Sequence, residues 1–199
     1  MANLDELPRP DCTRRTPRML LRPLRAADEA EWVRMSIVSE SLTAPFSPLP
    51  PEGPDPWVQR FHGSLARMAD GSSVRLVGIL EDGRIAGLFN LNEIVRGPFE
   101  NAYAGWSVNL EVAGEGYATE GVRGLLDIAF AAPPRGLGLH RVQANVIPRN
   151  HRSLRIIEKC GFRPEGLARS YLKIAGEWED HAMFAMLAEE WNGGEPAPV

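Results

Sequence analysis

Apolar and polar residues alternate along the chain with two different periods, which together predict a fold that mixes strands and helices. Residues 19–24 form a short apolar run that predicts a strand, and residues 26–40 carry apolar side chains at helical spacing. A second helical pattern covers residues 56–71. Between the helices, residues 45–56 contain six prolines, which remove backbone donors and predict a loop. This loop either connects the two helices or shapes the entrance to a substrate site.

The middle of the chain is predicted to be rich in strands. Residues 73–95 hold two β-like runs around Asp82 and Gly83, a dipeptide typical of a tight hairpin turn, so we expect antiparallel neighbours. A further run, 101–110, leads into the sequence EVAGEGYATEG at 111–121. After it, apolar residues recur at helical spacing, at positions Val122, Leu125, Leu126, Ala129 and Phe130. The small-residue loop therefore lies between a strand and a helix.

This order of strand, small-residue loop and helix suits an anion, although the same spacing also serves ordinary tight turns. Small side chains let backbone N–H groups converge, and the helix N-terminus adds about half a positive charge. No Gly-Lys-Ser/Thr follows, and the third glycine of a dinucleotide-binding pattern would fall at Thr119. Neither a nucleoside triphosphate nor NAD is indicated. We expect the backbone from Gly114 to Thr119 to hold a pyrophosphate without a metal.

A second strand and helix follow this unit. The alternation of residues 142–146 predicts a strand with one apolar face, which Pro148 ends. Asn150 then occupies an N-cap position, and Gly161 closes the helix. Besides capping the helix, Asn150 is placed to bond a ligand amide.

Composition and charge narrow the class of protein. The 199 residues are 44% apolar and 24% charged, which predicts one folded domain. Two cysteines, Cys12 and Cys160, give no disulfide framework and no metal-ligand cluster, so no metal site is expected.

The sequence also bears on location and partners. Its N-terminus has acids and prolines where a signal peptide needs an apolar stretch, and no apolar run has the length of a membrane span. A cytoplasmic location with no membrane partner is therefore expected. The net charge of −4 gives no basic footprint for nucleic acid and suits a basic protein partner better.

The order of these motifs resembles the GNAT acetyltransferases, and within them the ribosomal-protein-alanine N-acetyltransferases of RimJ/RimL type. Besides the loop, the resemblance rests on NEIVRGPFENAYAGW (92–106), ANVIPRNHRS (144–153) and YLKIAGEWEDH (171–181). It covers 18–191 and so implies a single acetyltransferase domain there, between flexible segments at 1–17 and 192–199. It implies an α/β (α+β) fold with a mixed, mostly antiparallel sheet of about seven strands flanked by helices. It also implies acetyl-CoA as the acetyl donor and no metal.

The resemblance leaves the acceptor and the assembly open. The expected acceptor is the N-terminal alanine of a basic ribosomal protein. A small amine, such as an antibiotic or a polyamine, is the nearest alternative, and a catalytically silent CoA-binding module is another. The oligomeric state is open, and a homodimer is one possibility.

The resemblance further implies which residues hold acetyl-CoA. The backbone of Trp106, Ser107 and Val108 would pair with the pantetheine arm, where two parallel strands splay apart. Asn150 would bond the pantetheine, and Ser153 would protonate the departing CoA thiolate. The pyrophosphate would be held by Gly114, Glu115, Gly116, Tyr117, Ala118 and Thr119.

Three positions depart from the family pattern. Ala113 stands where the family's loop usually opens with Gln or Arg. The loss of phosphate binding should be small if main-chain donors make most of the hydrogen bonds to the phosphate. Asn145 and Ile157 stand where other alanine N-acetyltransferases have a Glu and a Tyr. A general base is therefore not assured. Such a site suits an α-amine, with a pKa of about 7.7 to 8.0, better than a lysine at about 10.4.

The remaining candidates for catalysis lie in the C-terminal segment that resembles the family: Tyr171, Asp180 and His181. Asp180 and His181 are adjacent in a predicted strand, so they face opposite sides of the sheet and do not both reach one substrate. Packing or hydrogen bonding is the alternative role for both. Four tryptophans are expected in core or edge packing: Trp32, Trp57, Trp178 and Trp191.

Overall fold

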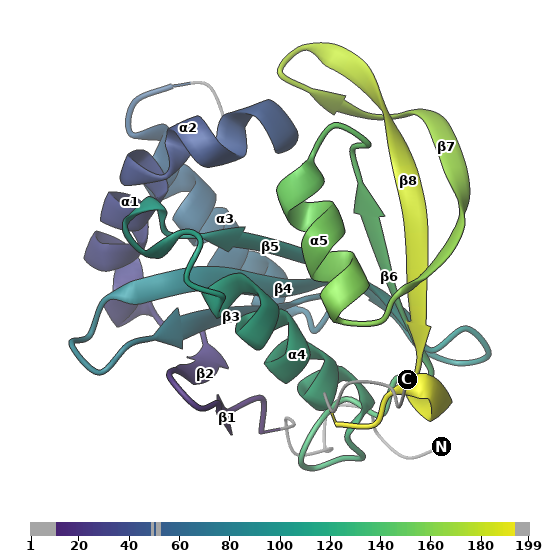
Figure 1. Cartoon of the computed structure of the whole chain (residues 1–199). Helices are drawn as coiled ribbons and strands as arrows, with labels where there is room; N and C mark the ends of the chain where they lie inside the picture. The colour runs from purple at the N-terminus through teal and green to yellow at the C-terminus, as the bar shows by residue number, and fades with distance from the viewer. Residues whose placement is uncertain (1–10, 49, 51–52, 194–199) are drawn as a thin grey trace.

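The computed structural model describes residues 11–48, 50 and 53–193, which fold around one eight-stranded sheet (Figure 1). The strand order is β1-β2-β3-β4-β5-β6-β8-β7. β5 and β6 run parallel, and the other neighbouring pairs run antiparallel. This architecture confirms the expected α/β (α+β) class with a mixed, mostly antiparallel sheet, which has one strand more than the expected number.

Most elements form within a few residues of their predicted limits. The strands are β1 (Arg14–Arg15), β2 (Leu20–Pro23), β3 (Val74–Ile79), β4 (Ile85–Val95), β5 (Asn101–Val108), β6 (Arg141–Val146), β7 (Arg163–Ile174) and β8 (Glu177–Leu187). The helices are α1 (Glu29–Val38), α2 (Glu40–Thr43), α3 (Pro56–Ala69), α4 (Tyr117–Phe130) and α5 (His151–Lys159). No helix in the described ranges is long and apolar enough to cross a membrane.

The ends of the chain show how far order extends beyond the predicted domain limits. Strand β1 lies within the segment 1–17, where we expected flexibility, and it pairs with β2. Cys12 is buried, and the Asp11 N–H donates to the Pro134 carbonyl at 2.7 Å. Residues 11–15 are therefore attached to the sheet. Residues 1–10 and 194–199 lie outside the described part of the chain.

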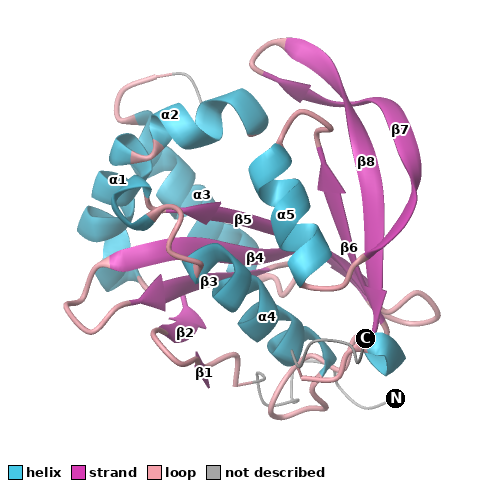
Figure 2. Ribbon diagram, in the orientation of Figure 1, coloured by secondary structure: helices cyan, strands magenta, loops and turns pink. Residues whose placement is uncertain are grey.

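Helices cover both faces of the sheet (Figure 2). On one face, α4 packs so closely that a Cβ at Gly121 would lie 2.0 Å from the Phe89 ring, which only glycine avoids. On the other face, α1 and α3 bury Trp32 and Phe61 against β3 and β4, with the two rings 5.5 Å apart. Trp178 departs from the expected packing, because it lies 63% exposed near the turn between β7 and β8.

The proline-rich segment 45–56 links α2 to α3. Its first residues complete a 3₁₀ turn, η3 (Ala44–Phe46), and Pro56 begins α3 at a position where proline is favoured. Residues 49, 51 and 52 lie outside the described chain. Phe46, Ser47 and Pro48 line a cleft in the sheet, so the described part of the loop does more than connect two helices.

Candidate active site

A cleft of about 750 Å³ opens where β5 and β6 separate. The two strands pair from Asn101 and Arg141 as far as Ala104 and Ala144, and no pairs follow although both strands continue. Figure 1 shows β6, β8 and β7 turned away from the direction of β2 to β5. The expected splay of the parallel strands is confirmed, and it opens the sheet toward both faces.

The loop before α4 presents main-chain N–H groups to this cleft. Gly114 and Gly116 have φ angles of 94° and 91°, in the left-handed region that costs other residues free energy. Gly116 is the N-cap of α4, and no side chain in the described chain caps this helix end. The N–H groups of Tyr117, Ala118 and Thr119 consequently lack partners inside the helix. Together with the helix dipole, they form a site suited to a pyrophosphate.

Buried polar contacts fix the chain that leads into this loop. Asn109 is fully buried; its Nδ2 donates to the Ile85 carbonyl at 2.9 Å, and its Oδ1 accepts from the Glu111 N–H at 3.0 Å. The Ser39 hydroxyl, after α1, accepts from the Leu110 N–H at 3.0 Å. The contacts with Ile85 and with Ser39 join segments far apart in the sequence, so the local pattern does not predict them.

Arg18 brings a positive charge to the loop that opens with Ala113. Its Nη1 donates to the Glu115 carbonyl at 2.9 Å, and its Nε donates to the Glu120 carboxylate at 2.7 Å. Its guanidinium also lies 4.2 Å from the centre of the Tyr117 ring. Arg18 comes from near the N-terminus of the chain, about a hundred residues before the loop. The loop motif therefore does not predict that Arg18 contacts it.

Helix α5 adds further basic residues to the cleft. Arg152, Arg155 and Lys159 line it and follow one another at i, i+3 and i+7, which places them on one side of the helix. The spacing of these three residues can be seen in the sequence, but they lie outside the small-residue loop motif, which therefore does not point to them. The three cations suit the phosphates of a bound CoA.

The start of α5 is built as predicted. Asn150 is the N-cap, and its Oδ1 accepts from the Ser153 N–H at 3.1 Å. Gly161 follows the helix with a φ of 77°. Asn150 and Ser153 both line the cleft, and within the described residues neither Asn150 Nδ2 nor the Ser153 hydroxyl has a hydrogen-bond partner. Both groups are therefore free to meet a ligand.

The structure brings nearly all of the predicted CoA-binding residues to the cleft. Those that line it are Trp106, Ser107, Val108, Gly114, Gly116, Tyr117, Ala118, Thr119 and Asn150. Glu115 is the exception, because its side chain is exposed and does not line the cleft. Its carbonyl contributes by accepting the hydrogen bond from Arg18.

His181 lies in the same cleft and is buried, with 4% of its surface exposed. Its Nδ1 lies 3.1 Å from the Glu179 carbonyl, which can only accept, so Nδ1 carries the hydrogen. In neutral imidazole, Nε2 then keeps a lone pair that can accept a proton. Asn145 also lines the cleft, and its Oδ1 is buried without a partner among the described residues.

Tyr171 and Asp180 lie beside the cleft and do not line it. The Tyr171 hydroxyl accepts from Asn145 Nδ2 at 2.9 Å, and its ring lies 5.2 Å from the His181 ring. Burial and the neighbouring Tyr103 raise the pKa of Tyr171, so the phenol stays protonated at neutral pH. Asp180 accepts from the Ser170 N–H at 2.8 Å, where the pairing of β7 with β8 is irregular.

Three further observations limit the chemistry of the site. Cys12 and Cys160 are both free and buried, and burial raises the pKa of each thiol to about 11. Neither is a thiolate at neutral pH, so neither can serve as a nucleophile without a large change of environment. Ile157, one of the positions that depart from the expected family pattern, packs in the core and does not line the cleft. Within the described ranges, no cluster of three His, Cys, Asp or Glu side chains could hold a metal.

Comparison with known proteins supports the same family. Residues 18–163 match the family described as the acetyltransferase (GNAT) domain. The chain belongs to the GNAT acetyltransferases. Like other GNAT acetyltransferases it is an acyltransferase, and N-acetyltransferases are its named relatives.

Three GNAT relatives illustrate the similarity. The [ribosomal protein uS5]-alanine N-acetyltransferase of Escherichia coli is 28% identical over 184 residues, 90% of this chain and 92% of that protein. The probable N-acetyltransferase YjcK of Bacillus subtilis is 43% identical over 106 residues, a match that spans 53% of this chain and only 56% of YjcK. Mycobacterium smegmatis RimJ, solved with CoA-disulfide, has a TM-score of 0.79 and 30% identity, covering 92% of this chain and 90% of that structure.

Proposed function

We propose that this GNAT enzyme transfers the acetyl group of acetyl-CoA directly to the α-amine of an N-terminal alanine, on a ribosomal protein. The observation that carries the proposal is the cleft through the splayed strands. It joins the phosphate-binding loop on one face of the sheet to His181 and Asn145 on the other. The similarity to alanine N-acetyltransferases along most of the chain supports the choice of acceptor.

The described residues fit acetyl-CoA. The first turn of α4 offers N–H groups to the pyrophosphate, and Arg152, Arg155 and Lys159 add positive charge. The free main-chain edge of β5 beyond Ala104 is available to the amide groups of the pantetheine arm. Asn150 Nδ2 can donate to the same arm. When bound, acetyl-CoA supplies the activated acetyl group as a thioester.

The residues on the acceptor side can move the protons that the transfer requires. The amine nitrogen bonds to the thioester carbon as the bond from that carbon to sulfur breaks. His181 Nε2 accepts the proton that the amine loses, directly or through water, and the Ser153 hydroxyl donates to the sulfur. Asn145 Oδ1 is placed to accept from the amine N–H. Since neither cysteine is ionised, direct transfer is favoured over an acetyl-cysteine route.

Tyr171 and Asp180 act in this proposal as positioning residues. The Tyr171 hydroxyl orients the Asn145 amide, and its ring packs near His181. Asp180 holds the irregular part of β7 from which Tyr171 extends. The domain limits 18–191, the cytoplasmic location and the possible homodimer remain predictions.

A screen of acceptors tests the proposal. Peptides that begin with alanine or serine are incubated with acetyl-CoA beside spermidine and aminoglycosides, and mass spectrometry locates the acetyl group. We expect acetylation of the α-amine of the alanine peptides and not of internal lysines. Acetylation of only spermidine or aminoglycosides would show a small-amine enzyme. No transfer, with CoA binding retained in calorimetry, would show a silent CoA-binding module.

A further inference from the structure

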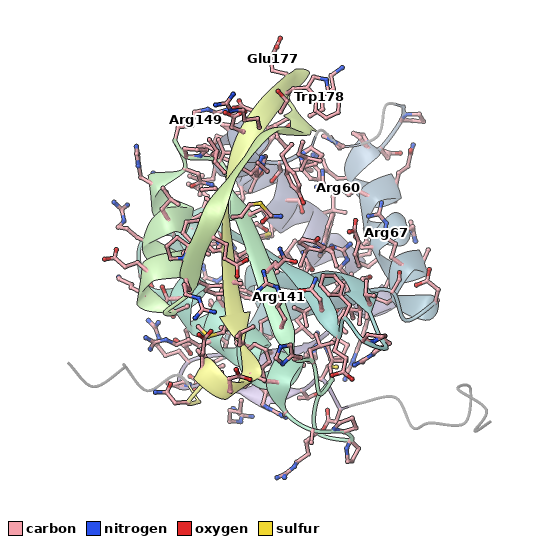
Figure 3. The ribbon with its side chains drawn as sticks, turned by 90° about the vertical axis from the view of Figure 1, so that its right-hand side faces the viewer. Arg60, Arg67, Arg141, Arg149, Glu177 and Trp178 are labelled. Atoms are coloured by element: carbon pink, nitrogen blue, oxygen red, sulfur yellow. The ribbon has the colours of Figure 1, made fainter. Side chains whose placement is uncertain are left out.

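Three arginines line the cleft on the face of the sheet opposite to the phosphate loop. Arg75 is on β3 between Val74 and Leu76, which both pack in the core with α4, whereas Val77 packs with α3. Because side chains alternate along a strand, Arg75 points toward α3. Arg60 and Arg67 come from α3, two turns apart and on one side of the helix (Figure 3).

These arginines lack the acidic partners that other arginines have. Arg22 pairs with Asp28 at 2.7 Å, and Arg34 pairs with Glu31 at 2.6 Å. Within the described residues, no carboxylate pairs with Arg60, Arg67 or Arg75. Arg60 Nη1 donates only to the Pro48 carbonyl, at 2.8 Å, and Arg75 Nε is buried with no hydrogen-bond partner in the described chain.

The electrostatics of this arginine cluster, Arg60, Arg67 and Arg75, favour an anion. Burial lowers the pKa of Arg75 to about 10, and repulsion from Arg67 and Arg60 adds to the effect. Burial and Arg67 also lower the pKa of Arg60. Arg60 and Arg75 are half-buried and Arg67 is exposed, and withdrawing like charges even partly from water is unfavourable unless a counter-charge joins them. A carboxylate bound among the three guanidiniums supplies that charge.

The sheet register relates this cluster to the reacting amine. Arg75 pairs with Asn90, and Asn90 pairs with Gly105. Gly105 and Asn145 each follow the last residues that join β5 to β6, so the four positions form one row across the sheet. Two paired strand spacings and the opening between β5 and β6 separate Arg75 from Asn145, so the distance is at least roughly 14 Å. An arginine side chain covers part of that distance, and an extended peptide covers the rest at about 3.4 Å per residue.

We propose that the arginine cluster binds a carboxylate side chain at the second or third residue of the acceptor, and so selects peptides with an acidic residue close to the reactive alanine. The inference rests on the proposed function, because it places the α-amine beside His181 and Asn145. It also predicts discrimination against polyamines, whose cationic chain would meet three guanidiniums. A basic protein tail can still be an acceptor if its second or third residue carries a carboxylate side chain.

Paired peptides test the inference. One begins Ala-Ala-Glu and the other Ala-Ala-Gln, with a third that carries its glutamate at the eighth residue. We expect kcat/KM for the first to exceed that for the second by about 10-fold to 100-fold, the range for hydrogen bonds to a charged group. The distant glutamate should give no advantage. Equal kcat/KM for the first two peptides would overturn the inference.

Arginine variants assign the effect to the cluster. Arg67→Gln and Arg75→Met should each reduce the preference for glutamate toward unity, because they lower kcat/KM for the glutamate peptide more than kcat/KM for the glutamine peptide. Arg25→Gln, at an exposed arginine outside the cleft, is the matched control and should keep the full preference. A preference that survives in both cluster variants would overturn the assignment. A loss of CoA affinity in them, measured by calorimetry, would instead show that the cluster holds a cofactor phosphate.

Calorimetry with the CoA-loaded protein separates this inference from the proposed function. Tighter binding of the glutamate peptide that depends on Arg67 and Arg75, without acetylation of any peptide, would support the anion site and refute the proposed reaction. Acetylation of alanine peptides regardless of the glutamate would support the reaction and refute the anion site. If peptides are neither bound nor acetylated, both proposals fail.

Discussion

Replacing Gly116 with valine tests whether main-chain N–H groups of the loop hold the cofactor. Gly116 has a φ of 91°, and a Cβ there would lie 3.4 Å from Arg18 Nη2. A β-branched residue in this region costs about 1 to 3 kcal/mol, which the loop can avoid only by rotating its peptide groups. Rotation turns one or two N–H donors away from the pyrophosphate. Each bond to a charged oxygen contributes about 1.5 to 3 kcal/mol, so CoA affinity should fall by about 10-fold to 1,000-fold or more.

Isothermal calorimetry measures the CoA affinity, and urea unfolding confirms that the variant is folded. Gly83→Val is a matched control, because Gly83 has a φ of 86° in the turn between β3 and β4, with no atom within 4 Å of its Cβ position. The control should lose similar stability and keep its CoA affinity. The reasoning is refuted if a folded Gly116→Val protein binds CoA as the control does.

Four further predictions follow from the site and the core. Ser153→Ala should lower kcat by up to about 10²-fold with little change in acetyl-CoA affinity; a wild-type rate would leave Ser153 only its place in the first turn of α5. For an alanine peptide, kcat/KM should rise with pH through about 7.7 to 8, as the α-amine loses its proton; a flat profile would contradict attack by the neutral amine. Gly121→Ala should lower the free energy of unfolding by about 1 to 3 kcal/mol, measured in urea, because its Cβ would overlap the Phe89 ring, and Phe89→Leu should restore part of the loss. Burial alone would raise the pKa of Asp28, but the Arg22 guanidinium lowers it below its ordinary value. The contribution of Asp28 to the free energy of unfolding is therefore present above the unfolded pKa of about 3.9 and is lost as pH falls. Urea unfolding should show that the wild-type protein loses its advantage in stability over Asp28→Asn below about pH 4.

Local sequence signals predict the fold, the small-residue loop and the start of α5 well, because short-range chemistry determines them. Glycines at 114 and 116 permit the left-handed turns of the loop, and Asn150 caps the helix that follows its own strand. Alternation and helical spacing likewise locate most elements, since each pattern reflects one buried face.

Long-range contacts explain what the sequence leaves undetermined. Arg18 reaches the loop from about a hundred residues away, and Arg75 meets α3 only after β3 and the helix pack together. Asp180 was a candidate for catalysis, but its strand neighbour His181 is the one that faces the cleft, and only the register of β8 decides this. The exposure of Trp178 also depends on how far the β7 and β8 hairpin extends beyond the sheet.

The separation of β5 from β6 gives the enzyme two entrances. If the donor enters from the side of α4 and α5 and the acceptor from the side of α3, neither has to leave before the other arrives. The kinetic scheme should then be sequential: double-reciprocal plots at several fixed acceptor concentrations should intersect, where a ping-pong enzyme gives parallel lines. Residues on the side of α3 can also change in evolution to suit a different amine acceptor, while the side of α4 and α5, where the donor would bind, stays the same.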